Sequence, residues 1–284
     1  MKQIFLATIL LSGLLSAPLP GFSQQTKKII DHADVQRWKK IEQQRISNDG
    51  QWVSWAQLPV AEGDAALYLW NEAGKQTRVF PRASEARFSS DNKLLIFTIK
   101  PPLDSLKAQR RKKVKDEDLP KDTLGILTLA TGQVEKIPRL KTVLVPEKWS
   151  GWFAFQCEPM KPAPAKKDTA KTQPKPAPKT AKEKKEDKDN GYRLVVRNTV
   201  SGKQDTIAYV KEFTLAKNSL RLLLYSTGWG DTMTVKTNRS IQKNGVYLYD
   251  LERSAIQPLF RSKGKFQQLS LDEQGEQAAF LADL

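Results

Sequence analysis

The sequence predicts an all-β protein that folds as a partial β-propeller, with four four-stranded blades and the start of a fifth. One turn motif recurs five times, and each copy precedes a short, largely apolar strand. A second hairpin turn recurs within each unit. The shortest unit runs from Ile46 to Phe88 and spans 42 residues, which is the size of a propeller blade. An unrelated β-sandwich with regular turns is the alternative.

Residues 1–23 have the features of a secretory signal peptide. A lysine precedes an apolar stretch of 12 residues at positions 4–15, which is too short to span a bilayer. The small residues Gly21 and Ser23 predict cleavage near Ser23, with a cut after Ala17 as the second choice. We therefore expect a periplasmic or secreted protein, with an uncleaved N-terminal membrane anchor as the alternative. No later segment is apolar enough to predict a membrane span.

Residues 24–45 form a lead-in, and residues 46–284 form the blades. We expect a short helix in the lead-in that carries His32 and includes Trp38. The last copy of the turn motif, at residues 269–275, is followed by a single strand. This ending predicts an open propeller and suggests the N-terminal part of a longer protein, because a closed propeller joins its last blade to its first.

The recurring motif is an apolar residue, a serine, a polar residue and then Asp-Gly or a related pair. The clearest copies are residues 46–50 (ISNDG), 88–92 (FSSDN) and 269–275 (LSLDEQG), and weaker copies begin near residue 145 and at residue 215. Asp, Asn and Gly accept a positive φ and so close tight hairpins. Ser and Asp side chains also bond nearby backbone N–H groups. The motif therefore predicts a turn and not a catalytic site.

The spacing of the two turns places every insertion at one joint of the unit. The second turn lies 13 to 16 residues before the next motif, whereas 28 to 57 residues separate each motif from its second turn. The variable half lies between the two hairpins, so the insertions should emerge on one face of the propeller. They cover residues 100–121, 158–190 and 227–244.

The three insertions differ in composition. The first, residues 100–121, is basic and is interpreted as a short helix or a mobile loop. Residues 158–190 are rich in Lys, Pro and Ala and are expected to be disordered, because they lack the apolar side chains needed to offset ordering entropy. The third contains Trp229 between two glycines, which is either a binding contact or a side chain that packs on its own blade.

The net charge of +16 does not predict a nucleic-acid partner. Residues 100–121 and 158–190 each contribute a net +4, so half of the charge lies in two segments with no apolar pattern. Export also separates the chain from nucleic acid. Solvated loops account for this charge, and they could approach an anionic envelope surface. A basic membrane-surface protein is a third functional class, and it rests on the charge alone.

The sequence contains no apparatus for catalysis, so we predict no catalytic, cofactor-binding or metal-binding residues. No Gly-x-Ser-x-Gly elbow and no phosphate-binding glycine loop is present. His32 is the only histidine and Cys157 the only cysteine, which excludes a zinc cluster of the usual kind and an internal disulfide. Cys157 follows an aromatic strand and is interpreted as a packing residue, with a reactive thiol as the alternative.

The order of these motifs resembles the N-terminal propeller of secreted prolyl oligopeptidase-type serine peptidases from Bacteroidetes-like bacteria. The resemblance covers the whole mature chain. It rests on Asp31, His32 and Trp38 in the lead-in and on five later segments: residues 46–53 (ISNDGQWV), 88–91 (FSSD), 97–101 (FTIKP), 119–122 (LPKD) and 124–126 (LGI).

The resemblance implies a propeller that caps a C-terminal α/β-hydrolase domain and admits peptides while excluding folded proteins. The hydrolase domain, which carries the Ser, Asp and His in that family, is missing from this chain. No catalytic residue can therefore be transferred, and we expect the chain to be inactive alone. A Glu-Glu pair of the kind that dipeptidyl-peptidase relatives use is also missing. The alternative is a non-enzymatic TolB-like propeller that acts as a protein-binding scaffold in the cell envelope.

Overall fold

The computed structural model describes residues 29–158, 191–227, 244–262 and 264–284. The predicted signal peptide and most of the second and third insertions lie outside these residues. In the described part, no helix combines the length and apolar character needed to cross a membrane. The helices are α2 (His32–Arg37), α3 (Leu103–Arg111) and the 3-10 turn η1 (Asp116–Asp118). The strands are β1 (Lys39–Ile46), β2 (Trp52–Pro59), β3 (Ala66–Asn71), β4 (Gln76–Pro81), β5 (Ala83–Phe88), β6 (Leu94–Ile99), β7 (Asp122–Thr128), β8 (Val134–Leu144), β9 (Trp152–Cys157), β10 (Tyr192–Asn198), β11 (Gln204–Leu215), β12 (Arg221–Ser226), β13 (Gly245–Asp250), β14 (Ala255–Arg261), β15 (Lys265–Leu271) and β16 (Ala278–Asp283).

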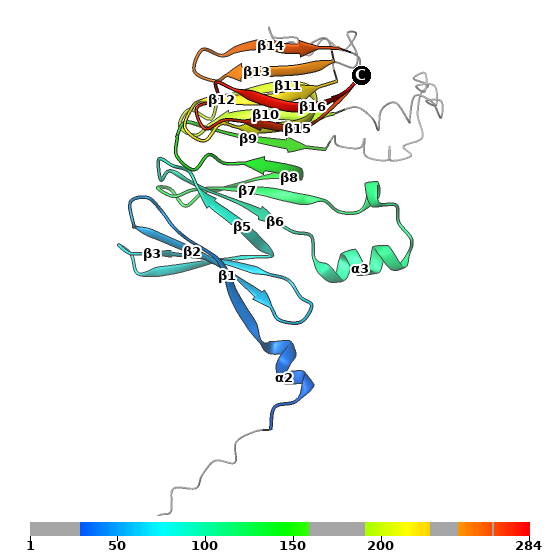
Figure 1. Ribbon diagram of the computed structural model, residues 1–284. Helices are drawn as coiled ribbons and strands as arrows, with labels where there is room; N and C mark the ends of the chain where they lie inside the picture. The colour runs from blue at the N-terminus through cyan, green and yellow to red at the C-terminus, as the bar shows by residue number, and fades with distance from the viewer. Residues whose placement is uncertain (1–28, 159–190, 228–243, 263) are drawn as a thin grey trace, which may run out of the picture.

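The strands form consecutive antiparallel blades, so the chain is a partial β-propeller of four blades and the start of a fifth, as predicted. Blade 1 is β1–β4, and β15–β16 begin blade 5. The ten strands between them form one continuous sheet, because β8 and β11 each serve two blades. Strand β8 pairs with β7 up to Leu140 and with β9 from Leu140 onward, and β11 changes partner at Val210. Blades 1 to 4 follow one another in sequence order (Figure 1), and β15 of blade 5 contacts β11 and β12 of blade 4.

A kink at one repeat position carries the chain from one blade to the next at the first three junctions. Arg82, Arg139 and Tyr209 have φ values of 61°, 63° and 58°. Residues other than glycine rarely adopt this backbone conformation, so the change in chain direction at these residues is sharp and locally strained. The carbonyl of each kink residue accepts a hydrogen bond of 2.9 Å from the backbone N–H that follows the second strand of the next blade, namely that of Lys100, Glu158 or Thr227.

The recurring serines fix the first turn of blades 1 and 2, as the motif predicted. The Ser47 hydroxyl accepts a 3.0 Å bond from the Trp52 N–H and donates to an Asp49 oxygen at 2.5 Å. Ser89 repeats this arrangement with the Leu94 N–H at 3.0 Å and with the carboxylate two residues after it at 2.6 Å. The hydrogen bond from Ser47 is the main reason why the pKa of Asp49 is lowered.

The fifth turn occurs two residues later than the predicted register. The Asp272 N–H bonds the Gln277 carbonyl at 3.0 Å, just as the Ser47 N–H bonds the Trp52 carbonyl at 2.9 Å. Asp272 therefore takes the place of the serine, and Ser270 lies inside β15. The sequence pattern LSLDEQG was aligned on its serine, Ser270, which lies two residues before the true turn position. The turn forms at Asp272 because an aspartate side chain, like a serine hydroxyl, can accept hydrogen bonds from the backbone N–H groups of the turn. Backbone N–H groups, that of Gln277 foremost, lower the pKa of Asp272.

The stems of all three insertions lie at one joint, which confirms the spacing argument. The pairs that end the second strand and start the third are Ile99 with Thr123, Cys157 with Arg193, and Ser226 with Gly245. The first insertion contains α3 and η1, so the helical alternative is correct. The Asp64 side chain accepts from the Leu103 N–H at 3.0 Å, and Lys107 pairs with Glu62. These contacts tether α3 to the corresponding loop of blade 1 (Figure 1).

The core consists of apolar layers between successive blades. Phe80 of blade 1 meets Phe97 of blade 2 with ring centroids 4.9 Å apart. Between blades 2 and 3, Phe153 and Phe155 pack with buried strand residues and with Cys157. Burial raises the pKa of the Cys157 thiol, so the reactive thiolate is disfavoured. The structure thus supports the packing role of this cysteine.

Candidate functional site

The first strands of neighbouring blades lie side by side and form the axial face of the protein. The Gln43 side-chain oxygen accepts from the Glu85 N–H at 2.7 Å, and the Glu212 carboxylate accepts from the Leu269 N–H at 3.0 Å. Each of these strands has a register shift in its pairing with the second strand of its blade. Such bulges redirect side chains and are frequent near functional sites. The axial face is therefore lined by polar side chains held between blades.

Two adjoining pockets lie where these first strands reach their turns, and we call them together the axial mouth. One pocket of about 180 Å³ extends from Arg45 to Glu147, and the other of about 340 Å³ extends from Arg87 to Lys217. They share four lining residues: Arg87, Val145, Pro146 and Glu147. The mouth therefore connects the axial strands of blades 1 to 4.

An ion pair divides the axial mouth. Arg87 of blade 2 lies 3.0 Å from Glu147 of blade 3, and the side chains are 46% and 75% exposed. Salt screens such an exposed pair, and it contributes little to stability. It can open when a ligand competes for the guanidinium. Apolar residues that line the same pocket, including Val145 and Leu215, provide contact area for a side chain.

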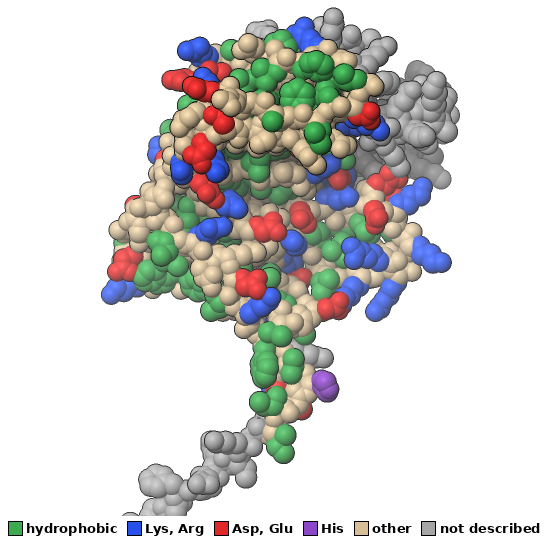
Figure 2. All heavy atoms as spheres, viewed as in Figure 1, with side chains coloured by type: hydrophobic (Ala, Val, Ile, Leu, Met, Phe, Trp, Pro, Cys, Tyr) green, Lys and Arg blue, Asp and Glu red, His purple; other side chains and the backbone are tan. Residues whose placement is uncertain are grey.

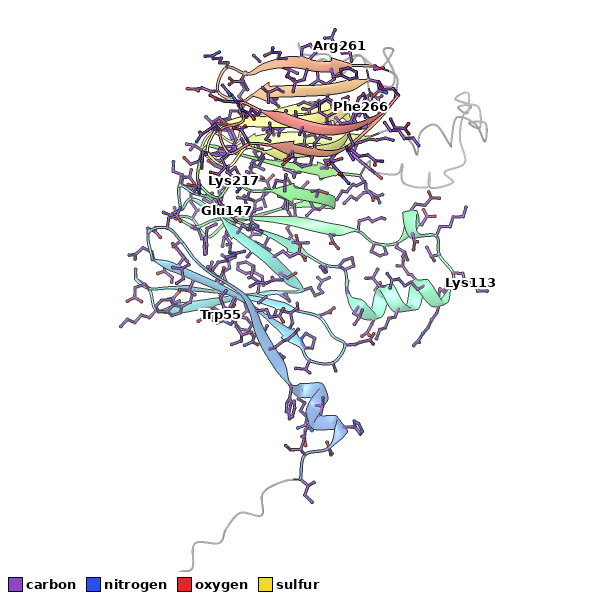
Figure 3. The ribbon with its side chains drawn as sticks, viewed as in Figure 1. Trp55, Lys113, Glu147, Lys217, Arg261 and Phe266 are labelled. Atoms are coloured by element: carbon purple, nitrogen blue, oxygen red, sulfur yellow. The ribbon has the colours of Figure 1, made fainter. Side chains whose placement is uncertain are left out.

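Basic groups outnumber acidic ones around the axial mouth. Arg45, Arg87, Lys148 and Lys217 line it with Glu147 as the one acidic lining residue. Figure 3 shows Glu147 and Lys217 at neighbouring turns, on the opposite side of the molecule from Lys113 and the α3 insertion. Nearby, Lys217 pairs with a carboxylate of blade 5 at 3.0 Å. Acidic and basic side chains are mixed along this side and do not form one basic field (Figure 2). The mouth therefore suits an extended peptide with a carboxylate better than a polyanion.

A second charged cluster lies at the insertion end of blades 2 and 3. Glu158 bridges Lys121 at 3.4 Å and Arg139 at 2.9 Å. Asp122 lies nearby, and desolvation raises its pKa despite the opposing effect of Lys100. The cluster joins the stems of two insertions. These contacts position the insertion stems, and no nucleophile is placed among them.

The described residues place no catalytic constellation together. His32 is exposed on α2, below the blades and apart from the axial mouth (Figure 2). Asp31 is the N-cap of α2, and its carboxylate accepts from the Asp34 N–H at 2.9 Å. Trp38, which was predicted within this helix, is its C-cap and has an extended backbone conformation. The Ser47 and Ser89 hydroxyls are used in turns. In the part of the chain that the structure covers, no three His, Cys, Asp or Glu residues gather as a possible metal site.

The sequence analysis did not identify the residues of the axial mouth. Arg45 and Arg87 both stand two positions before the motif serine, in RIS and RFS. The repeated arginine could have indicated a functional position, because the chemistry of the turn does not require an arginine there. Glu147 and Lys217 lie within the two degenerate copies of the motif, and only the packing of blades shows that they line a pocket with Arg87.

Comparisons with known proteins show similarity at the level of structure. No family model matches the chain, and no curated protein matches its sequence. A prolyl endopeptidase is 12% identical with a TM-score of 0.45, over 82% of this chain and 31% of the other. The β-propeller domain of the trilobed protease from Pyrococcus furiosus, described as having an open velcro topology, is 13% identical with a TM-score of 0.30, over 87% and 79%. TolB from Acinetobacter baumannii is 12% identical with a TM-score of 0.36, over 84% and 48%.

The chain thus spans less than a third of the prolyl endopeptidase chain. At these identities and TM-scores, the similarities assign neither an activity nor a partner. The assignment of the fold follows from the blade topology itself.

Proposed function

We propose that this chain is the propeller part of a secreted serine peptidase of the prolyl oligopeptidase type. In this proposal it controls the access of peptides to a separate C-terminal α/β-hydrolase domain and contributes no catalytic residue. The axial mouth is the observation that carries the proposal. Its pockets of about 180 and 340 Å³ have room for side chains of an extended peptide and not for a folded domain. The resemblance of the lead-in and blade motifs to the propeller of prolyl oligopeptidase-type peptidases supports the same proposal.

The chemistry of the mouth fits a gating role. Arg87 and Glu147 hold each other across two blades through an exposed ion pair. A peptide carboxylate or ammonium group can replace either partner at small cost, because an exposed pair contributes about 0–1 kcal/mol. Binding of this kind is weak and reversible, as passage of a substrate requires.

The first test determines the coding sequence beyond the codon for Leu284. We expect an in-frame hydrolase domain with a Gly-x-Ser-x-Gly nucleophile elbow. A genuine stop codon followed by unrelated sequence contradicts the proposal and favours the envelope scaffold of TolB type.

The second test concerns activity and export. The purified chain is expected to hydrolyse no chromogenic peptide above background and to react with no fluorophosphonate, since acyl transfer requires a serine activated by a histidine. The protein from the periplasm or medium should begin just after Ser23. Stoichiometric labelling that is lost in His32→Ala would show that the chain is a peptidase of another type. A retained residue 1 would identify an N-terminal anchor.

A further inference from the structure

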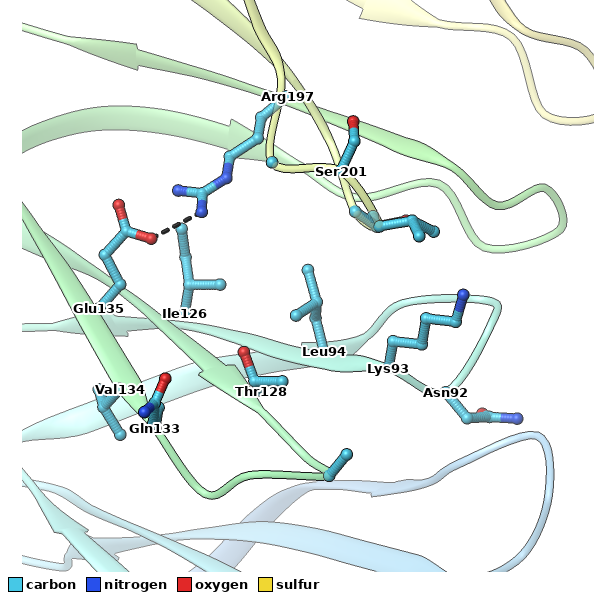
Figure 4. A pocket seen from close by; sticks show the side chains of 14 residues that line it. Asn92, Lys93, Leu94, Ile126, Thr128, Gln133, Val134, Glu135, Arg197 and Ser201 are labelled. Carbon is cyan, nitrogen blue, oxygen red and sulfur yellow. Dashed lines mark ion pairs between the residues drawn. The ribbon is translucent and has the colours of Figure 1, made fainter.

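A separate cleft opens between blades 2 and 3, away from the axial mouth. It has a volume of about 1010 Å³ and is bounded by the starts of β6 and β8, the ends of β7 and β10, and the turn after β10 (Figure 4). Its lining residues do not overlap with those of the axial mouth. The volume is that of a site for a small molecule or a short peptide.

The floor of this interblade cleft is apolar. Leu94 and Ile126 line it and are 6% and 3% exposed, because they also belong to the core between blades 2 and 3. Val200 stands on the turn of blade 3 and is 64% exposed. A ligand with apolar side chains would cover Val200 and extend the interblade core, and removing this apolar surface from water favours binding.

One arginine reaches into this apolar cleft. Arg197 projects from β10 of blade 3, and its Nη2 atom lies 2.7 Å from a carboxylate oxygen of Glu135 on β8 of blade 2 (Figure 4). The Arg197 side chain is 16% exposed, whereas that of Glu135 is 48% exposed. The Arg197 Nη1 atom is buried and has no hydrogen-bond partner among the described residues. The guanidinium is thus mostly buried, whereas its counterion is about half exposed and can turn toward solvent without unpacking the core.

The unused donor indicates what the arginine could hold. A guanidinium can bind one carboxylate through two parallel hydrogen bonds, yet Glu135 engages a single nitrogen. Leaving a charged donor unsatisfied in a buried position is costly. A ligand carboxylate that displaced Glu135 could pair with both terminal nitrogens once the guanidinium turns Nη1 toward the cleft. Thr128, Gln133 and Ser201 line the same cleft and offer hydrogen bonds to a peptide backbone.

We propose that the interblade cleft binds the carboxyl-terminal residues of an apolar peptide, with Arg197 holding the terminal carboxylate in place of Glu135. The apolar floor would receive the side chains and the polar rim would contact the peptide bonds. This site is distinct from the axial mouth, and its binding does not require a hydrolase domain.

The test uses calorimetric titration of the purified chain with N-acetyl-Leu-Leu-Leu and with the amide of the same peptide. We expect the free acid to bind about tenfold more tightly than the amide, because only the acid offers a charged partner to the Arg197 guanidinium. Equal affinities for acid and amide, or no binding at millimolar concentration, would overturn the proposal.

Two substitutions break the same ion pair and should act in opposite directions. Arg197→Gln should weaken binding of the acid about tenfold or more, because it removes the carboxylate ligand. Glu135→Gln should strengthen it several-fold, because it removes the competing carboxylate. Arg253→Gln, on the turn after β13 of blade 4 and outside the cleft, is the control for loss of an arginine and should change nothing. Weaker binding by both Arg197→Gln and Glu135→Gln would mean that the pair has a structural role only.

Folding of each variant is checked by circular dichroism before titration. Arg197→Lys provides a second measurement if Arg197→Gln fails to fold, since lysine retains the charge but not the bidentate geometry. The Arg197→Lys variant should bind the free acid more weakly than the native chain binds the acid, but more tightly than the native chain binds the amide. An affinity equal to that of the native chain would contradict the bidentate arrangement.

Discussion

At the scale of single residues, the serine of the turn motif has a defined structural role. The Ser89 hydroxyl accepts from the Leu94 N–H, donates to Asp91 and is buried. Its neighbour Ser90 contributes a carbonyl that accepts from the Asn48 side chain. Two adjacent serines in one turn therefore differ in whether the hydroxyl is needed.

Ser89→Ala should destabilise the protein by about 1 kcal/mol, because it leaves a buried backbone N–H without its acceptor. Ser90→Ala should remain within about 0.5 kcal/mol of the native chain, as is usual for surface changes. Urea denaturation followed by tryptophan fluorescence measures both. Equal effects of the two substitutions would show that the hydroxyl does not fix the turn.

Asp122 is a residue whose charge opposes folding. Desolvation raises its pKa above the ordinary value of 3.8, so the folded state binds the proton more tightly than the unfolded state. The stability linked to this group therefore falls as the pH rises through the raised pKa.

Asp122→Asn should accordingly raise the melting temperature at pH 7, and the difference from the native chain should vanish below pH 3.8, where the native carboxyl is protonated in both states. Glu72→Gln, on an exposed turn, is the control and should show no such difference. A lower melting temperature for Asp122→Asn at pH 7 would indicate that Lys100 and Lys121 dominate the site.

At the scale of strands, one cross-strand pair determines how closely β6 and β7 pack. Gly125 of β7 stands opposite Phe97 of β6, and a Cβ atom on Gly125 would lie 2.4 Å from the aromatic ring. Phe97 in turn contacts Phe80 of blade 1. The glycine therefore makes room for the ring that joins the first two blades.

Gly125→Ala should destabilise the chain by about 1–3 kcal/mol, because the ring must leave its position in a packed core. Gly74→Ala is the control, since the nearest atom to its added Cβ is 3.4 Å away and belongs to a side chain. The midpoint of urea denaturation distinguishes them. A neutral Gly125→Ala would mean that Phe97 has another favourable rotamer.

The strands were predictable to the extent that they depend on local chemistry. Turn residues and alternating apolar positions predicted the blades, the joint that carries the insertions and the end of the chain within a fifth blade. The shared strands β8 and β11 were not predictable. Arg82 and Arg139 occupy the same repeat position, yet Arg82 lies between β4 and β5, whereas Arg139 lies within β8. This difference depends on pairing with both neighbouring strands, which no local pattern encodes.

The binding residues were less predictable because they depend on packing between blades. Arg197 and Glu135 lie 62 positions apart in the sequence and belong to different blades. Their residue types are common on exposed strands. The stacking of blade 3 on blade 2 determines that Arg197 pairs with Glu135. The same stacking forms the apolar floor of the interblade cleft.

At the scale of the whole molecule, hydrogen bonds between turns reinforce the stack of blades. Asn48 of blade 1 donates from its backbone and side chain to the turn of blade 2, at 2.9 and 3.0 Å. Asn218 of blade 4 contacts Glu273 of blade 5 through both its backbone N–H, at 2.8 Å, and its side chain, at 3.3 Å. Blades that contact only their neighbours can open one at a time from the ends.

Asn48→Ala should therefore loosen blade 1 and leave the distant blades unchanged. The lost side-chain hydrogen bond contributes about 1 kcal/mol, which corresponds to roughly fivefold faster amide exchange in β1–β4. Asn218→Ala should act in the same way on β15 and β16, so each variant serves as the control for the other. Hydrogen exchange measured by mass spectrometry locates the effect. If either substitution accelerated exchange equally in all blades, the blades would open as a single cooperative unit and the two interfaces would not act independently.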